Sequence, residues 1–319
     1  MTSIEQIPPT SLGTAGPIVS RLCLGTSSWA RAANPLDPVE LLDQVFVGEG
    51  SGERVRYIDT ANEYSGGLSE TLIGDAIHQH GGLPEGLVIQ TKLDRDVRTG
   101  DFSSDRMWRS LEESLGRLHL DSLPMLFLHD PEHIGFEKAM ANDGPVTALV
   151  EMKRSGVAER IGISGGPVGL LEKFVGTDLF DAVITHNRYT LVDRSAQALV
   201  NASRARGVAV LNAAVYGGGA LAKWPVPATT YAYVPIRAEV AAAISAMGEA
   251  CSRLDIPLAA AALQWSTRNP AITSSIFGVA SSAQLGATVA LDAVSIPSSL
   301  WEELEELVPP AESWIGASR

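Results

Sequence analysis

The chain has 319 residues, 45% of them hydrophobic and 19% charged, with a formal net charge of −13 and a pI near 4.9. This length suits one large α/β domain or two smaller ones. An acidic surface does not neutralise phosphates, so nucleic acid and anionic membranes are poor partners and a small-molecule substrate fits better. The two cysteines, Cys23 and Cys251, have no CxxC spacing, and we predict neither a disulfide framework nor a bound metal. We expect a soluble cytoplasmic protein, because the sequence shows no signal-peptide pattern and no uncharged apolar stretch long enough to span a bilayer.

Short apolar runs, rich in β-branched residues or leucine, recur along the chain and predict strands that are buried on both faces. They cover residues 18–26, 55–61, 87–92, 123–129, 160–164, 181–187, 208–214 and 272–279. Helical periodicity separates them, as in 105–119, where Met107, Leu111, Leu115 and Leu118 recur every three or four residues.

Eight strands that alternate with helices in a chain of this length predict a (β/α)8 TIM barrel, an α/β fold. A doubly wound sheet is the second candidate. We predict a single barrel domain over residues 1–319, because no shift in composition and no linker divides the chain.

One connection is longer than a barrel requires. Residues 214–235, after the seventh strand, contain three consecutive glycines together with Trp224, Tyr231 and Tyr233. Loops of this length in a compact domain are commonly functional, and the aromatic side chains suit a cover over a bound ligand. The alternative is a solvent-exposed loop that packs on itself.

In a TIM barrel the chemistry occurs at the carboxyl ends of the strands. Polar residues at these predicted ends are Thr26, Asp59, Lys92, His129, Ser164, His186, Asn187 and Asn212, and Tyr64 follows one short loop later. Taken singly, Asp59 suits a turn or helix cap, Lys92 a surface lysine and His129 a histidine beneath a loop. Their coincidence at one end of consecutive strands favours an active site.

Asp59, Tyr64, Lys92 and His129 together suit proton exchange with a carbonyl or alcohol oxygen. A neighbouring ammonium lowers the pKa of a phenol, so Lys92 can activate Tyr64 as a general acid or base. A buried lysine needs a carboxylate partner to remain charged, which gives Asp59 its role. His129 can orient the substrate oxygen. Because no side chain carries a hydride, this arrangement implies a nicotinamide cofactor.

The segments "RLCLGTSSW", "YIDTANEYSGGLSETLIGDAI", "VIQTK", "LFLHDPE" and "IGISGG" resemble the aldo-keto reductase superfamily over nearly the whole chain. "HNRYTLVDRS" and "LNAAVYGGGAL" are similar to its aldose dehydrogenase branch, of the D-threo-aldose 1-dehydrogenase or L-fucose dehydrogenase type, and also to pyridoxal 4-dehydrogenase. The resemblance implies a TIM barrel and a catalytic tetrad at Asp59, Tyr64, Lys92 and His129.

The resemblance also implies positions for the cofactor. Gly25 and Thr26 match residues beside it, and Ser164 matches the residue that holds the carboxamide. Gly165 stands where asparagine is common and His186 where glutamine is common, which leaves Asn187 as a neighbouring candidate. The remaining candidates are Asn212, Tyr216 and Gly217 around the seventh strand and Gly278, Ser282 and Gln284 after the eighth.

The stretch after the eighth strand contains no lysine or arginine, whereas many NADP-dependent relatives hold the 2′-phosphate there with cations. We therefore expect NAD in preference to NADP. Trp29, Tyr64 and His129 are the candidate substrate contacts, since an aromatic wall suits the apolar face of a sugar or a flat heteroaromatic ring.

The sequence thus predicts an NAD(P)-dependent oxidoreductase that oxidises an aldose at C1 to the lactone, with Tyr64 as general acid and base. Pyridoxal oxidation and general aldehyde or ketone reduction are alternatives within the same chemistry. Two further classes remain open: an aldolase that forms a Schiff base on Lys92, and a barrel that binds its cofactor for regulation without catalysis.

Overall fold

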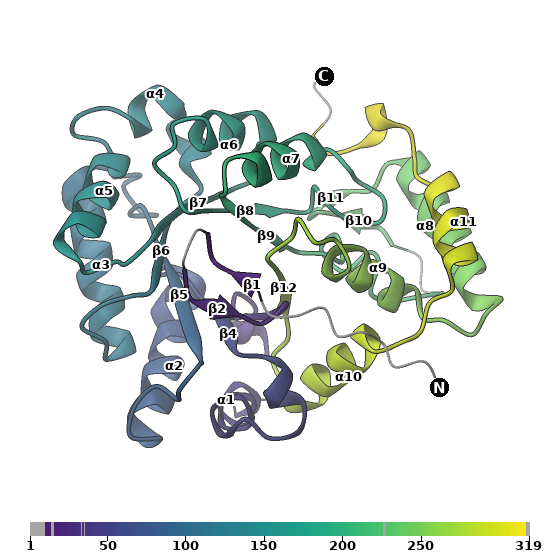
Figure 1. Cartoon of the computed structure of the whole chain (residues 1–319), viewed down its shortest axis with the longest axis horizontal. Coiled ribbons are helices and arrows are strands. Elements are labelled where there is room, and N and C mark those ends of the chain that lie inside the picture. The colour runs from purple at the N-terminus through teal and green to yellow at the C-terminus, as the bar shows by residue number, and fades with distance from the viewer. Residues whose placement is uncertain (1–9, 14–15, 33, 35, 226–227, 317–319) are drawn as a thin grey trace.

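A computed structural model shows a closed barrel of eight parallel strands surrounded by helices (Figure 1). The structure describes residues 10–13, 16–32, 34, 36–225 and 228–316. The barrel strands are β3 (Leu22–Gly25), β4 (Tyr57–Asp59), β5 (Val88–Leu93), β6 (Met125–His129), β7 (Ile161–Gly165), β8 (Ala182–His186), β9 (Ala209–Ala213) and β12 (Ser274–Gly278). Each expected apolar run therefore contains one barrel strand. β12 pairs in parallel with both β9 and β3, which closes the ring and excludes the open doubly wound sheet.

Helices follow the strands along the chain and form an outer ring (Figure 1). They are α1 (Asp37–Val47), α2 (Leu68–Gln79), α3 (Ser104–Leu118), α4 (Phe136–Ala139), α5 (Pro145–Ser155), α6 (Val168–Val175), α7 (Gln197–Ala205), α8 (Ala238–Ser252), α9 (Leu258–Thr267), α10 (Ser282–Asp292) and α11 (Ser298–Glu306). Short 3-10 turns are η1 (Trp29–Arg31), η2 (Gly50–Arg54), η3 (Tyr64–Gly67), η4 (Pro131–His133) and η5 (Ala311–Ser313). Among the residues that the structure describes, no helix is long and apolar enough to cross a bilayer.

A short hairpin of β1 (Thr10–Ser11) and β2 (Ile18–Val19) lies across the centre of the ring of strands in Figure 1. Its Leu12 and Val19 belong to one apolar cluster with Cys23, Tyr57 and Phe127 from the barrel strands. Residues in the first three positions of the strands thus form the interior core. The carboxyl ends of the strands are left for polar side chains.

The long connection after β9 contains a second hairpin, formed by β10 (Thr230–Tyr231) and β11 (Val234–Pro235). Tyr231 is buried in a second apolar cluster with residues of α8, α9 and α11, including Met247 and Leu304. Residues 226 and 227 of this loop lie outside the described residues, as do residues 1–9, where the sequence showed no signal-peptide pattern. Tyr231 thus anchors the loop against these helices, whereas Tyr233 is 74% exposed.

The interior of the barrel is filled closely at Gly162 of β7. A methyl group added there meets the Phe127 ring and the end of the Met125 side chain. We expect Gly162→Ala to lower the free energy of unfolding by about 1–3 kcal/mol, as overpacked cores do.

Urea unfolding measures this effect, and Gly116→Ala is the matched control. Gly116 lies inside α3, where an added methyl group meets no atom within 4 Å. Helix propensity alone then predicts a gain of roughly 0.5–1 kcal/mol for this variant. Equal effects of the two substitutions would contradict the packing argument.

Candidate active site

A cavity of about 550 Å³ opens at the carboxyl ends of the barrel strands. Its walls come from the ends of all eight barrel strands and from the connection after β9. Asp59, Tyr64, Lys92 and His129 all line it, so side chains from three separate segments of the chain meet at one surface. A cavity of this size is typical of a small-molecule site.

Lys92 is the centre of this group. Its side chain is buried, and Nζ lies 2.7 Å from Asp59 Oδ1 and donates to the Thr60 carbonyl oxygen at 2.8 Å. Nζ also donates to the Tyr64 hydroxyl at 3.0 Å. Three acceptors therefore surround the ammonium, and one of them is the phenol at the cavity wall.

Two buried side chains inside the barrel, Gln90 and Tyr57, hold Asp59 in position. Gln90 on β5 donates Nε2 to Asp59 Oδ1 at 2.6 Å, and the Tyr57 hydroxyl donates to Gln90 Oε1. Tyr57, Asp59 and Gln90 are all buried. The sequence reading did not identify Gln90 or Tyr57, because inward-facing residues of continuous apolar strands carry no periodicity signal.

Burial by itself shifts the pKa values of Lys92 and Tyr64 in opposite directions. Burial lowers the pKa of Lys92, but the Asp59 carboxylate and Tyr64 outweigh it, so the pKa is raised and the ammonium persists. Burial raises the pKa of Tyr64, and Lys92 opposes this effect without overcoming it. Lys92 thus lowers the pKa of Tyr64, as expected. The total shift of that pKa is nevertheless upward, so the expected net direction was wrong.

His129 faces Tyr64 across the cavity, with ring centroids 5.7 Å apart in an edge-to-face arrangement. Its Nδ1 lies 2.8 Å from Asp94 Oδ1, in the segment that follows β5. Burial lowers the pKa of His129, but Asp94, with a contribution from Asp130, outweighs burial and raises it. The sequence analysis did not predict a role for Asp94. The available indication was its position, two residues after Lys92.

Six of the expected cofactor residues line the same cavity, namely Gly25, Ser164, His186, Asn187, Tyr216 and Gly278. Asn187 donates Nδ2 to His186 Nδ1 at 3.0 Å. Burial and the neighbouring Arg188 charge lower the pKa of His186 to about 4, so its imidazole is neutral at pH 7. Asn187 Oδ1 and the Tyr216 hydroxyl are buried without a hydrogen-bond partner among the described residues.

The other expected residues lie away from the cavity wall. Thr26 donates its hydroxyl to the Asp59 carbonyl oxygen, and Asn212 donates Nδ2 to the Tyr189 carbonyl oxygen and to Ser266 Oγ. Gly217 packs against the Tyr231 ring, and Gly165 leaves room for the Glu132 carboxylate. These four residues therefore support residues around the cavity and do not line it themselves.

Three further expectations concern the first and last strands. Trp29 was expected to contact substrate, but it is buried and donates Nε1 to the Val279 carbonyl oxygen at 2.9 Å. Gln284 accepts the Ala280 N–H, and Ser282 begins α10 beside it; neither lines the cavity. Tyr233 lines the cavity, as was expected of the aromatic residues in the long loop after the seventh strand. Ser27, Ser28 and Asp130 also line it and were not expected. The two serines follow directly on Thr26 in "GTSSW", which was the available signal.

Residues 21–309 match the model of the Aldo/keto reductase family. The chain belongs to this family. This confirms the resemblance read from the motifs, and it makes the protein an oxidoreductase of a family that uses nicotinamide cofactors.

Three proteins named as dehydrogenases are similar along most of their length. Pyridoxal 4-dehydrogenase of Microbacterium luteolum is 27% identical over 92% of this chain and 95% of its own. D-threo-aldose 1-dehydrogenase of a Pseudomonas species is 29% identical over 80% and 85%. L-galactose dehydrogenase of Arabidopsis thaliana is 26% identical over 98% and 97%.

A solved aldo-keto reductase from Bacillus halodurans, in its holo form, has the same fold. The TM-score is 0.79 at 22% identity, and the match covers 97% of this chain and 98% of that one. Sequence motifs, barrel topology and this structural match therefore agree on the fold.

The residues present fit a nicotinamide group. The cavity is large enough, and the unpaired Asn187 oxygen and Tyr216 hydroxyl offer a buried acceptor and a buried donor to a polar ligand. When bound, the nicotinamide supplies the hydride acceptor or donor that no side chain can provide. The chain itself supplies the proton chemistry beside it.

Proposed function

We propose that this aldo-keto reductase oxidises the C1 hydroxyl of an aldose in its cyclic form to the lactone, with NAD as cofactor, as an enzyme of carbohydrate metabolism. The observation that carries the proposal is the contact of Lys92 with both Asp59 and Tyr64 at the wall of the cavity. The named activities of the D-threo-aldose and L-galactose relatives support the substrate class.

In this proposal Tyr64 exchanges a proton with the substrate oxygen. Its oxygen accepts the Lys92 hydrogen bond, so the phenolate form of Tyr64, which takes the proton of the alcohol in the oxidation, is stabilised. Asp59 keeps Lys92 charged, and His129 holds the substrate oxygen from the opposite side. Tyr64 and His129 thus bind the same substrate oxygen, while Asp59 and Lys92 act through Tyr64.

The surroundings of Lys92 argue against a Schiff-base aldolase. An amine must be neutral to attack a carbonyl, whereas this ammonium has three acceptors and a raised pKa. The intact proton relay likewise argues against a purely regulatory barrel.

A panel of L-fucose, D-arabinose, L-galactose and D-xylose with NAD tests the proposal through the absorbance of the reduced nicotinamide. We expect turnover of at least one sugar. Pyridoxal belongs in the same panel, because its cyclic hemiacetal presents the same reacting group and a pyridoxal 4-dehydrogenase is among the relatives. Turnover of pyridoxal alone, or only carbonyl reduction, would overturn the aldose assignment.

For cofactor choice we expect NAD to bind more tightly than NADP by roughly tenfold, or about 1.4 kcal/mol. The chain has no lysine or arginine between Phe277 and Asp292, so the segment beside Gly278 offers no cation to a 2′-phosphate. Titration of the intrinsic fluorescence with each nucleotide measures both affinities. Ser282→Arg, at the first residue of α10, is expected to tighten NADP and leave NAD unchanged. Tighter binding of NADP by the natural chain would reverse the cofactor assignment.

A further inference from the structure

Asp94 binds the ring of His129 from behind the cavity wall. The carboxylate is nearly buried, at 7% exposure, and its two oxygens have separate partners. Oδ1 lies 2.8 Å from His129 Nδ1, and Oδ2 accepts the Glu63 backbone N–H at 3.0 Å. The carboxylate therefore links His129 to the segment that carries Tyr64.

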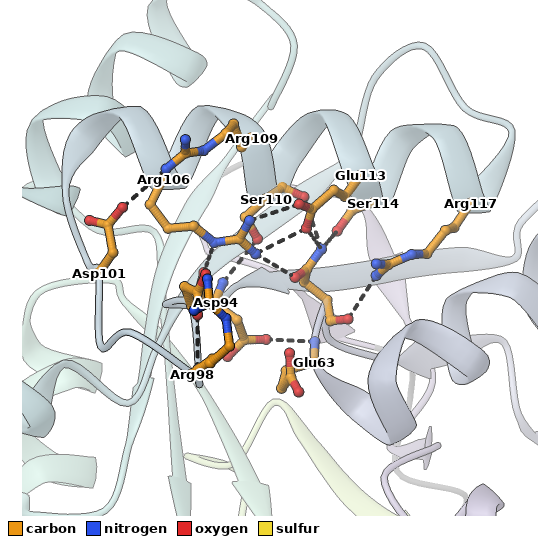
Figure 2. Close-up of polar contacts among 12 residues, drawn as sticks. Glu63, Asp94, Arg98, Asp101, Arg106, Arg109, Ser110, Glu113, Ser114 and Arg117 are labelled. Atoms are coloured by element: carbon orange, nitrogen blue, oxygen red, sulfur yellow. Dashed lines mark hydrogen bonds and ion pairs between the residues drawn. The ribbon is translucent and has the colours of Figure 1, made fainter.

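The backbone of Asp94 is held against α3 (Figure 2). Its N–H donates to Ser110 Oγ at 3.0 Å, and its carbonyl oxygen accepts from Arg106 Nε at 3.1 Å. Arg106 is fixed in turn by two hydrogen bonds to Glu113, at 2.7 and 2.9 Å. A side chain supported this way keeps its position while a substrate binds and leaves.

The protonation of His129 follows from this geometry. Burial raises the pKa of Asp94, but His129 outweighs it and lowers the pKa, so the carboxylate is ionised and only accepts hydrogen bonds. Nδ1 must then carry a hydrogen atom. Nε2 has no hydrogen-bond partner among the described residues, and Asp130 Oδ1 lies 3.7 Å from it.

We propose that Asp94 is a positioning residue for the reaction. By accepting the Nδ1 hydrogen of His129, it makes Nε2 the ring atom that exchanges a hydrogen bond with the substrate oxygen. Neutral His129 accepts a hydrogen bond from an alcohol at Nε2, and protonated His129 donates one to a carbonyl. The inference rests on the proposed oxidoreductase reaction and adds that its two directions use forms of the enzyme that differ by one proton.

Other groups face His129 and contribute to its titration. Lys92 on β5 lowers the pKa of His129, and Asp130 in the turn after β6 raises it. The remaining titratable neighbours are Tyr64 of η3, Glu132 of η4 and His186 of β8. Among the carboxylates in the described part of the chain, only Asp94 hydrogen-bonds the ring, so it is the residue to change.

Asp94→Asn tests the assignment with little change in volume. The Glu63 N–H retains an acceptor only if the amide oxygen turns toward it, which presents the NH2 group to Nδ1. His129 then changes tautomer and carries its hydrogen on Nε2. Loss of the carboxylate also lowers the pKa of the ring, because the nearby negative charge that favours the imidazolium is removed.

The first measurement is nuclear magnetic resonance of the imidazole nitrogens in the free protein, which needs neither substrate nor turnover. We expect Nδ1–H in the natural chain and Nε2–H with a lower titration midpoint in Asp94→Asn. His129→Gln assigns the signal. The same tautomer and midpoint in both proteins would overturn the proposal, even if activity were lost.

The second measurement is the pH profile of kcat/KM for oxidation. The acidic limb, where His129 must lose its proton, is expected to move to lower pH in Asp94→Asn and to remain near its original pH in Asp94→Glu. Asp101→Asn is the matched control, since this more exposed carboxylate pairs with Arg109. A uniform fall at every pH, without a shift, would indicate a merely structural role.

A double-mutant cycle completes the test. In a His129→Gln background, Asp94→Asn is expected to cause no further loss of kcat/KM, because Asp94 acts through the ring. An additional loss as large as in the natural chain would contradict the proposal. Absence of turnover on every substrate, with the expected change of tautomer, would instead refute the proposed function and leave the role of Asp94 toward His129 standing.

Discussion

Tyr64→Phe is expected to lower kcat by about 10²–10⁴-fold while cofactor affinity stays within about twofold. The substitution removes one hydroxyl that lies at the cavity wall and accepts the Lys92 hydrogen bond at 3.0 Å. The ring remains, so its edge-to-face contact with His129 is kept. Without the hydroxyl, no group in contact with the Lys92 ammonium can exchange a proton with the substrate oxygen.

Steady-state rates with the best substrate of the sugar panel measure this effect, and nucleotide titration by fluorescence checks that the site is intact. Tyr233→Phe is the matched control, because Tyr233 also lines the cavity but is 74% exposed. Loss of the Tyr233 hydroxyl should change KM far more than kcat. A Tyr64→Phe enzyme that retained most of its kcat would remove Tyr64 from the proton-transfer role.

Asp59→Asn is expected to lower the free energy of unfolding by about 3–5 kcal/mol at neutral pH, because it leaves the buried Lys92 ammonium without its carboxylate. In the natural chain the pKa of Lys92 is raised above its ordinary value, so this contribution to stability is complete below about pH 10.4. It is lost only as the pH rises through the still higher folded pKa. In the variant, the buried amine titrates lower, and the deficit should shrink as the pH approaches 10.

Urea unfolding at neutral pH and near pH 10 measures both effects. The double variant Asp59→Asn/Lys92→Met removes the uncompensated charge as well, and it should recover most of the lost stability. A single variant within about 1 kcal/mol of the natural chain, or a double variant as unstable as the single one, would show that the pair is not desolvated as the structure indicates.

The sequence by itself determined the fold class and the position of the tetrad. Strands buried on both faces must be continuously apolar, so eight such runs were visible without any tertiary information, and each contains one barrel strand. Asp59, Lys92 and His129 lie within two residues of the ends of those runs. Because parallel strands in a closed barrel end at one rim, their convergence followed from the fold alone.

The tertiary structure decided which neighbouring side chains act on that tetrad. Asp94 lies only two residues beyond Lys92, yet its carboxylate reaches His129 on the next strand because α3 holds its backbone through Arg106 and Ser110. Trp29 is the opposite example. It lies beside the site in sequence, but its side chain is buried in the core, where it donates a hydrogen bond to the Val279 carbonyl oxygen. The direction in which such a side chain points depends on the stagger between strands and on packing against helices that are distant in sequence. Local periodicity predicts neither of these.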